Sequence, residues 1–502
     1  MARYKDYNYQ QSQLIPISFS RQILPGSFEY TLSHLIDHEI DLTAFHAKYR
    51  NDETGAPAYD PAILLKIVLY AYSRGITSSR DIERCCVENI IFMALSADTH
   101  PHFTTIADFV SSMGEQIATL FREVLMICDE MGLIGREMFA IDGCKLPSNA
   151  SKEWSGTREE LGRKAEKMDQ AVRFMLDRHR AEDNSGGPSK RRQKEAQQIE
   201  TLQRNIRKIR DWLDDHDDKP GKSGKPLKSN ITDNESAKMK TGHGVIQGYI
   251  GVAAVDSKHQ VVVHAEAFGE AQEHDLLLPM VEAVRANLGK NTFEQGGLAA
   301  DRGYHSEKNV KELFEQGIDG YVADTQFRKR DPRFATADRH KGESRRKYYA
   351  PKDFIYDEAS QSCICPAGRK LYRNGSHCLV NGYEAVKFQG AKSACVPCTQ
   401  RRQCLRSPEK TATRQVYFFK GRSQNAPETY THKMKRKIDT PEGRHRYSRR
   451  LGIVEPVFGN LCSAIGLNRF SLRGKLKVDI QWKLYTIVQT LLKIHRYGAV
   501  FG

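Results

Sequence analysis

The sequence predicts an α/β protein with a mixed sheet, preceded by an all-helical N-terminal region. One observation is helical periodicity between residues 61 and 131, with Pro or a capping Ser or Thr near each expected start. Another is a series of short apolar or β-branched runs, which predict strands. These runs lie at 139–143, 245–255, 260–268, 297–301 and 320–323.

The N-terminal region contains three expected helices: 61–72, one opening at 77–83, and one from 104 to about 131. Short helices joined by tight turns permit a helix-turn-helix-like DNA reader, and equally a plain helical bundle. Periodicity alone does not separate these two alternatives.

The expected strands follow one another in a recognisable order. A first strand is followed by an insertion, a hairpin of two strands, a helix, a strand, a second helix at 307–316 and a last strand. This order fits the ribonuclease H-like fold, a mixed sheet flanked by helices. Asp256 falls in the hairpin turn, where we expect it to be exposed to solvent.

Two insertions interrupt the expected sheet. Residues 155–218 are highly charged with apolar residues at helical spacing, which predicts a hairpin of two long helices. Residues 331–442 are rich in charge and cysteine. The expected organisation is therefore an N-terminal helical DNA-binding domain (1–132), a first core part (133–330) that carries a helical-hairpin insertion (155–230), a cysteine-rich basic insertion (331–442), and a last core part (443–502).

The charge balance indicates a polyanionic partner. The 502 residues carry a formal net charge of +15, with a pI near 9.2. Residues 401–450 hold fifteen Lys and Arg against four acids. Such a run is often only a solvated face, but it leads directly into Glu455, which favours contact with phosphate. Lys435, Arg436 and Lys437 are the candidates.

The N-terminus shows no export signal, and no apolar run approaches the length that spans a bilayer. We therefore expect a soluble, cytoplasmic protein. Eleven cysteines in this setting argue against a disulfide framework.

Three acidic residues close or follow short apolar runs. Asp142 lies in Phe-Ala-Ile-Asp-Gly, Asp301 in Leu-Ala-Ala-Asp-Arg-Gly-Tyr, and Glu455 in Leu-Gly-Ile-Val-Glu-Pro-Val-Phe-Gly-Asn. Carboxylates that converge from distant parts of a chain are typical of Mg²⁺ sites for phosphoryl transfer, because Mg²⁺ prefers oxygen ligands.

These three segments resemble the bacterial insertion-sequence DDE transposases, and the third resembles that group's Tyr-Arg-Glu-Lys signature. The N-terminal helical segments are also similar to the group, which favours binding of terminal-repeat DNA. The resemblance implies the ribonuclease H-like fold and catalysis by Asp142, Asp301 and Glu455. It also implies two Mg²⁺ (or Mn²⁺) ions per active site, which act in DNA cleavage and strand transfer.

The resemblance extends to Tyr447 and Arg450, which precede Glu455 at the group's spacing. Arg450 suits a phosphate clamp, although a surface arginine in a basic run is the plainer reading. The group's pattern next expects a Lys, and Cys462 stands there instead. Lys475 or Lys477 could substitute for it. The departure from the group's pattern leaves open whether this protein is catalytically active.

Six cysteines fall between residues 363 and 404. A C-x-x-C pair with distant thiols is a zinc-ribbon pattern, and a similar module occurs in part of the same transposase group. We expect Cys365, Cys395, Cys398 and Cys404 to bind a structural zinc ion, and Cys363 and Cys378 to be outside it. The alternative is a loop of reduced thiols.

The sequence thus predicts a DDE transposase that acts as a homodimer or larger assembly on the double-stranded DNA of inverted terminal repeats and on target DNA, near the bacterial nucleoid. Two rivals remain: a non-catalytic DNA-binding protein derived from a transposase, and a nuclease with the same fold and metals.

Overall fold

The structure is a computed structural model that describes residues 16–49, 57–182, 190–221, 224–242, 244–334, 348–375, 378–380, 382–423 and 427–498. The chain divides into two compact units. The core unit contains residues 1–325 and 437–502, and the cysteine-rich unit contains residues 326–436. None of the helices in these described ranges is long and apolar enough to cross a membrane.

The N-terminal part of the core unit is helical, as predicted. Its helices are α1 (Phe28–His34), α2 (Thr43–His46), α3 (Pro61–Ser73), α4 (Ser79–Glu88), α5 (Ile90–Leu95), α6 (Phe103–Ser112) and α7 (Gly114–Glu130). Asp60 caps α3, and Pro61 occupies its first turn.

One expected helix is wrong in its extent. The segment from 104 to about 131 forms two helices, α6 and α7, which are separated by Met113. The backbone of Met113 leaves the helical region, and its side chain is buried. Gly114 follows it, and a Cβ there would lie 3.2 Å from Cδ1 of Ile480 in α18, which is a tight contact. The break therefore lies where the chain packs against a distant helix, which the local pattern does not reveal.

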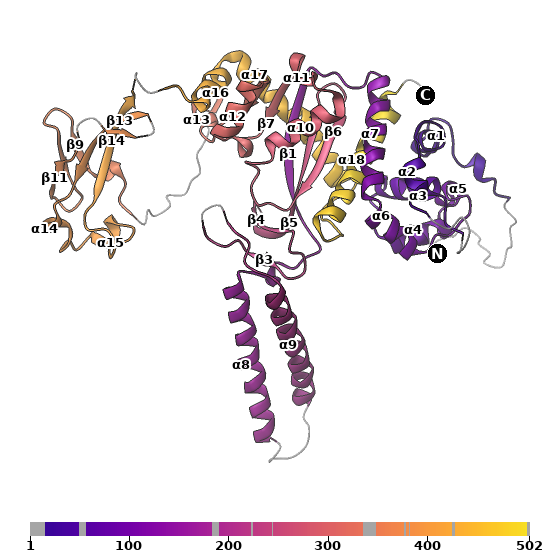
Figure 1. The fold of residues 1–502 in the computed structure, drawn as a ribbon, viewed down its shortest axis with the longest axis horizontal. Helices are drawn as coiled ribbons and strands as arrows, with labels where there is room; N and C mark the ends of the chain where they lie inside the picture. Colours follow the sequence, from indigo (N-terminus) through magenta and orange to yellow (C-terminus); the bar gives the residue numbers. More distant parts are fainter. Residues whose placement is uncertain are drawn as a thin grey trace, which may run out of the picture. The chain divides into compact units, whose positions relative to one another are not determined.

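The central sheet of the core unit is mixed (Figure 1). Its strands are β1 (Met138–Pro147), β4 (Ala237–Thr241), β5 (Gly244–Asp256), β6 (Val262–Phe268), β7 (Gly297–Ala300) and β8 (Asp319–Val322). The order is β4-β5-β1-β7-β8, and β6 also pairs with β5. β1 runs antiparallel to β5 and parallel to β7. The five predicted strands are confirmed, and β4 was not predicted.

Helices pack against this sheet. They are α10 (Leu277–Leu288), α11 (Thr292–Gln295), α12 (Glu307–Glu315), α17 (Pro441–Gly459) and α18 (Lys475–Tyr497). α17 packs on β1, β7 and β8, and α18 packs on β6 and on the N-terminal helices α3, α6 and α7 (Figure 1). The indole N–H of Trp482 in α18 donates to Val252 O at 2.9 Å, which fixes α18 to the sheet.

Asp256 contradicts its expected exposure. Its side chain is buried, and its carboxylate accepts hydrogen bonds from the backbone N–H groups of Gly135, Arg136 and Lys258 at 2.8–3.0 Å. The carboxylate thus provides hydrogen-bond acceptors for backbone N–H groups in the turn that leads into β1. A turn pattern in the sequence does not reveal this role.

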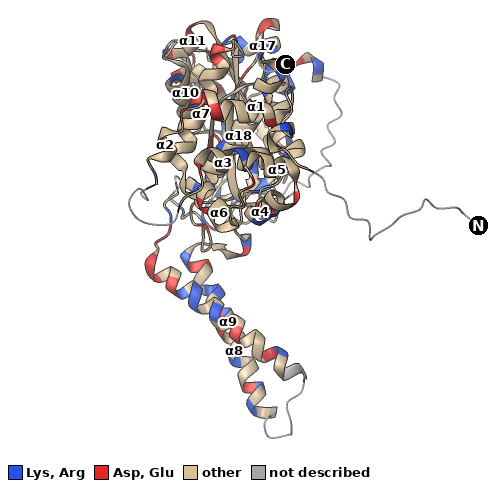
Figure 2. Ribbon diagram, turned by 90° about the vertical axis from the view of Figure 1, so that its right-hand side faces the viewer, with Lys and Arg blue, Asp and Glu red and all other residues tan. Residues whose placement is uncertain are grey.

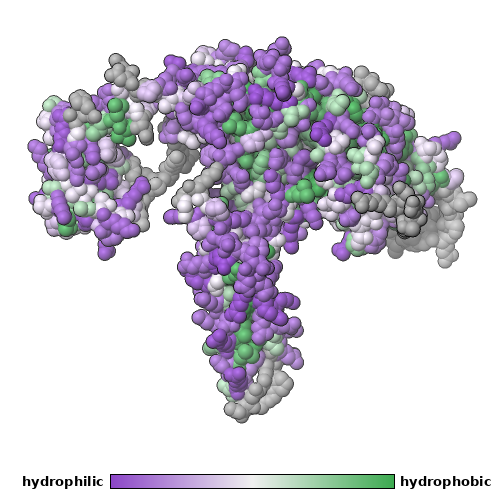
Figure 3. Space-filling view, viewed as in Figure 1, coloured by the Kyte–Doolittle hydropathy of each residue, from purple (hydrophilic) through white to green (hydrophobic). Residues whose placement is uncertain are grey.

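Two long helices leave the sheet after β1. They are α8 (Arg158–Glu182) and α9 (Lys190–Asp215), anchored at their base by the short pair β2 (Ser155–Gly156) and β3 (Ser229–Asn230). Lys and Arg alternate with Asp and Glu along both helices (Figure 2). A narrow hydrophobic strip runs along an otherwise hydrophilic surface (Figure 3). The two helices pack through small clusters that include Leu161, Val172, Ile206 and Ile209.

The cysteine-rich unit has a six-stranded antiparallel sheet of its own. Its elements are α13 (Phe327–Arg330), β9 (Ile355–Asp357), β10 (Ser362–Ile364), β11 (Lys370–Arg373), β12 (Cys378–Val380), β13 (Tyr383–Gln389), α14 (Lys392–Cys395), α15 (Arg401–Cys404) and β14 (Gln415–Arg422). Helix α16 (Tyr430–Asp439) contains the boundary to the core unit. Residues 326–436 hold 25 Lys and Arg against 9 Asp and Glu, so this unit carries essentially the whole net positive charge of the chain.

Candidate active site and cysteine cluster

Two of the three expected acids lie side by side at the edge where β7 ends. β1 and β7 are parallel and pair Ile141 with Ala300, so Asp142 and Asp301 follow as neighbours. Their side chains are 23% and 33% exposed. Asp142 also accepts a hydrogen bond from the N–H of Gly143 at 2.8 Å.

Arg450 of α17 bridges these two carboxylates. Its Nη1 lies 2.5 Å from Oδ2 of Asp142, and its Nη2 lies 3.3 Å from Oδ1 of Asp301. The arginine is only 8% exposed, and its guanidinium carbon lies 5.9 Å from the ring centroid of Tyr447. Burial raises the pKa of Asp142, and the positive charge of Arg450 opposes this rise. Arg450 is thus the counterion of the acidic pair.

Glu455 lies on the same helix but on a different side. Ile453, Val454 and Val457 form the buried face of α17 with Arg450, whereas Glu455 is exposed. Five residues of an α-helix correspond to a rotation of about 140°, which separates Glu455 from Arg450. The structure therefore joins Asp142 and Asp301 through Arg450 and leaves Glu455 on the surface of α17. Within the described ranges, no three His, Cys, Asp or Glu side chains are arranged to hold a metal ion.

Glu273, Tyr304 and Lys145 complete the surroundings of the two aspartates. Tyr304 closes the sequence motif around Asp301, and Lys145 follows the motif around Asp142, whereas the sequence did not point to Glu273. Glu273 lies between β6 and α10, is 15% exposed and pairs with Lys145 at 3.9 Å. Burial raises the pKa of Glu273, Lys145 lowers it, and Asp142 and Asp301 raise it. The residues share one electrostatic environment, although Glu273 stands in no motif.

An open groove of about 560 Å³ begins at this point. It is lined by Gly143, Lys145, Lys240, Thr241, Gly242 and Glu273. The groove thus has two lysines on its walls and reaches β1 directly after Asp142.

Cys462, at the position where the group's pattern expects Lys, lies near the same strand. Its thiol interacts with that of Cys144, two residues after Asp142. The hydrogen bond from Cys144 lowers the pKa of Cys462 to about 7, while burial opposes this shift. Of the two possible substitutes, Lys475 pairs with Glu266 at 3.2 Å, and Lys477 is exposed on α18.

The basic stretch before Glu455 is partly engaged within the protein. Lys437 pairs with Asp319 at 2.6 Å, and its ammonium lies 4.4 Å from the ring centroid of Tyr321. Arg436 pairs with Glu428 at 3.2 Å but remains 75% exposed. Lys437 and Arg436 therefore differ in how freely they can contact DNA.

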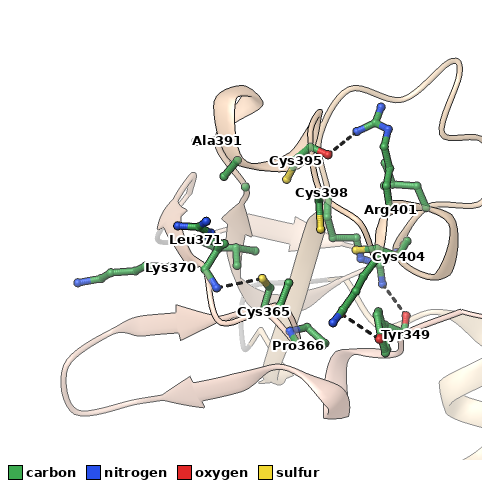
Figure 4. A pocket seen from close by; sticks show the side chains of 17 residues that line it. Tyr349, Cys365, Pro366, Lys370, Leu371, Ala391, Cys395, Cys398, Arg401 and Cys404 are labelled. Carbon is green, nitrogen blue, oxygen red and sulfur yellow. Dashed lines mark hydrogen bonds between the residues drawn. The ribbon is translucent and has the colours of Figure 1, made fainter.

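The four cysteines expected to bind zinc line one cavity in the cysteine-rich unit, and their sulfur atoms point into it (Figure 4). The cavity measures about 40 Å³. Burial raises the pKa of Cys404, Arg414 lowers it, and Cys395, Cys365 and Cys398 raise it, so the four thiols influence one another electrostatically. Within the described residues, however, no three of these thiols are arranged to hold a metal ion. The N–H of Arg369 donates to Sγ of Cys365 at 3.3 Å. Cys363 lies instead in the hydrophobic core of the unit.

Comparison with protein families gives two matches. Residues 17–112 match a family described as a transposase domain (DUF772), and residues 364–495 match a family described as a transposase DDE domain. The first match contains α1 to α6, and the second contains Arg450 and Glu455. The comparison with curated proteins found no match.

The chain is therefore a DNA transposase, an enzyme that cuts DNA and transfers strands. More narrowly, the two matched regions support a DDE transposase of an insertion sequence.

Proposed function

We propose that this transposase acts at the inverted terminal repeats of an insertion sequence, and that Asp142, Asp301 and Glu455 form its catalytic site. The observation that carries the proposal is the pairing of Asp142, in the middle of β1, with Asp301, directly after the end of β7, under the buried Arg450. The strand order β6-β5-β1-β7-β8 supports a ribonuclease H-like core. Glu455 faces away from the two aspartates, so its part in the site requires a rearrangement of α17.

The donor set at this place fits a divalent cation. The carboxylates are hard oxygen ligands, and the guanidinium that now neutralises them is a charge that Mg²⁺ or Mn²⁺ can replace. Bound there, such ions activate water and stabilise the charge that develops on the phosphate.

The residues of the chain would orient the reaction. Water attacks the scissile phosphorus, the bond to the 3′ oxygen breaks, and the leaving oxygen takes up a proton to give a 3′-OH. In the second step this 3′-OH attacks a target phosphodiester, and a target 3′ oxygen leaves in its turn. Arg450, displaced from the aspartates, would bind a phosphate oxygen, because its planar guanidinium offers two parallel donors.

We further propose that Cys365, Cys395, Cys398 and Cys404 bind one structural zinc ion. Their common cavity and the N–H donated to Cys365 support a tetrahedral thiolate site. Four thiolates leave no open position, so this site would stabilise the cysteine-rich unit rather than catalyse.

DNA contacts are proposed for Lys435, Arg436, Lys437, Tyr447 and Arg450, and terminal-repeat binding for the N-terminal helices. An assembly of two or more chains, working beside the bacterial nucleoid, would hold two element ends together.

Incubation of the protein with its element ends and Mg²⁺ or Mn²⁺, followed by mapping of the cleaved strands, tests the proposal. We expect 3′-OH ends at the element boundary and products joined to target DNA. Cleavage without joined products would support a nuclease, and binding without cleavage would support a non-catalytic derivative.

A further inference from the structure

Glu273 is the acidic residue that the three-residue catalytic pattern does not include. It is nearly buried beside Lys145, and its charge acts on Asp142 and Asp301. Asp142 and Asp301 raise the pKa of Glu273, so the three carboxylates repel one another in the metal-free site.

A second, independent observation concerns Tyr304. Its side chain is fully buried, and in the part of the chain that the structure describes its hydroxyl has no hydrogen-bond partner. The hydroxyl points toward β1, 3.2 Å from where a Cβ on Gly143 would lie. A buried hydroxyl without a partner is costly, so its position indicates a ligand that is to be bound beside Asp142.

Glycine provides the space that this arrangement needs. A Cβ on Gly303 would lie 2.1 Å from Oε2 of Glu273. The carboxylate of Glu273 thus lies directly against the backbone that follows Asp301, and the absence of a side chain at Gly303 allows this approach.

We propose that Glu273 is a further carboxylate of the metal centre, and that the adjoining groove receives the phosphates of the DNA strand to be cut. The inference rests on the proposed function and deepens it. In the metal-free enzyme, Lys145 neutralises Glu273 as Arg450 neutralises the aspartates. A divalent cation near Glu273 replaces that positive charge and frees Lys145, which with Lys240 faces the groove and can bind phosphate oxygens.

Mn²⁺ binding to the full chain without DNA, measured by the electron paramagnetic resonance of free Mn²⁺, tests the role of Glu273. We expect Glu273→Gln to weaken binding by about 10- to 100-fold, the range for residues that support a metal site. Glu270→Gln is the matched control, because Glu270 is exposed three residues earlier in the same segment. Equal Mn²⁺ affinity of wild type and Glu273→Gln would overturn the inference.

Gly303→Ala gives a second variant that keeps every charge. The added methyl group displaces the carboxylate of Glu273, and the backbone of Gly303 has an ordinary φ, so alanine is tolerated. We expect weaker Mn²⁺ binding here as well, and an unchanged affinity would count against the inference. Asp142→Asn and Asp301→Asn distinguish a failure of the proposed catalytic site from a failure of the inference about Glu273. If these two variants keep the Mn²⁺ affinity of the wild type while Glu273→Gln lowers it, the proposed aspartate site fails and the role of Glu273 in metal binding stands.

The groove is tested by the salt dependence of DNA binding. Lys240→Gln should reduce the slope of log K against log salt by about 0.9 on duplex DNA, the value for one phosphate that is no longer neutralised. Lys238→Gln is the control, because Lys238 lies on the same strand, is exposed and does not line the groove. If both variants keep the wild-type slope, the groove does not bind DNA.

Discussion

Arg450 of α17 donates a hydrogen bond into the carboxylate of Asp142 on β1, although 308 positions separate the two residues in the sequence. The cysteine-rich unit lies between them in the chain. This contact attaches α17 to the sheet through the acidic site itself. The docking of the helix that bears Glu455 therefore depends on how the charges of Asp142 and Asp301 are balanced.

The acidic residues give the first prediction. Asp142→Asn, Asp301→Asn and Glu455→Gln should each abolish cleavage and leave binding to element ends largely intact, because each loses a carboxylate that would hold the metal ions, and those ions stabilise the charge on the reacting phosphate. Strand cleavage and gel-shift assays on the same preparations measure both properties. Cleavage at the wild-type rate by one of these variants would remove that residue from the site, and Glu455 faces the most demanding test because it is exposed.

Arg450→Gln should destabilise the metal-free protein and increase its response to Mn²⁺. Breaking a buried pair costs about 3–5 kcal/mol, and the partial exposure of both aspartates reduces the expected loss to about 1–3 kcal/mol. Mn²⁺ should raise the free energy of unfolding more in the variant than in the wild type, because a bound ligand stabilises the folded state. In the variant, the guanidinium of Arg450 no longer competes with Mn²⁺ for the two aspartates. Urea unfolding with and without Mn²⁺ measures this.

The control for this experiment is Arg449→Gln. Arg449 pairs with Glu137, which is 69% exposed, so a change within about 0.5 kcal/mol is expected. A metal-free Arg450→Gln protein as stable as wild type would show that the bridge contributes nothing to docking.

Much of this arrangement could be predicted from the sequence, and the reason is local. Runs such as 245–255 and the Pro at residue 61 predict strands and helix starts through short-range pattern, and the apolar runs before Asp142 and Asp301 form parts of β1 and β7 for the same reason. The strand β1 continues past Asp142 to Pro147, which the apolar run alone did not indicate. Glu273, by contrast, is a single glutamate in an irregular segment, and only the packing of Tyr304 and Gly303 around it reveals its place. The partner of Arg450 was likewise hidden, because side-chain direction on α17 depends on which face packs against β1.

The basic stretch should divide into two kinds of residue. Lys435→Gln with Arg436→Gln should weaken DNA binding and lower the salt slope by about 0.9 for each phosphate that the variant no longer neutralises. Lys437→Gln should instead lower the stability of the protein, because Lys437 is held by Asp319 and Tyr321. Salt-dependent binding and urea unfolding of the same variants distinguish these effects. A reduced slope for Lys437→Gln alone would reverse the assignment.

The cysteine cluster predicts about one zinc ion per chain by elemental analysis, as four thiolates suit one tetrahedral site. Cys395→Ser with Cys398→Ser should lose the metal and destabilise the cysteine-rich unit, because the free energy of structural zinc binding contributes directly to folding. Cys363→Ser is the comparison: that thiol lies in the hydrophobic core, so zinc should remain bound. Metal-free wild-type protein with an intact fold would leave the cluster as reduced cysteines.

Cys462 should be the thiol whose reactivity changes near neutral pH. The hydrogen bond from Cys144 lowers the pKa of Cys462 to about 7, and the same contact raises the pKa of the buried Cys144 well above its usual range. The thiolate is the reactive form, so alkylation of Cys462 should accelerate as pH rises through about 7 and then level off, while Cys144 stays unreactive.

Peptide mass spectrometry after brief iodoacetamide treatment measures the alkylation of each cysteine, and Cys85, whose pKa is raised by burial, is the internal comparison. Cys144→Ala removes the hydrogen bond and should move the reactivity of Cys462 to higher pH. If Cys462 reacts no faster than Cys85 at pH 7.5, Cys462 and Cys144 do not share a hydrogen bond. Cys462, which stands where the family pattern has lysine, then lies farther from β1 than a hydrogen bond to Cys144 requires.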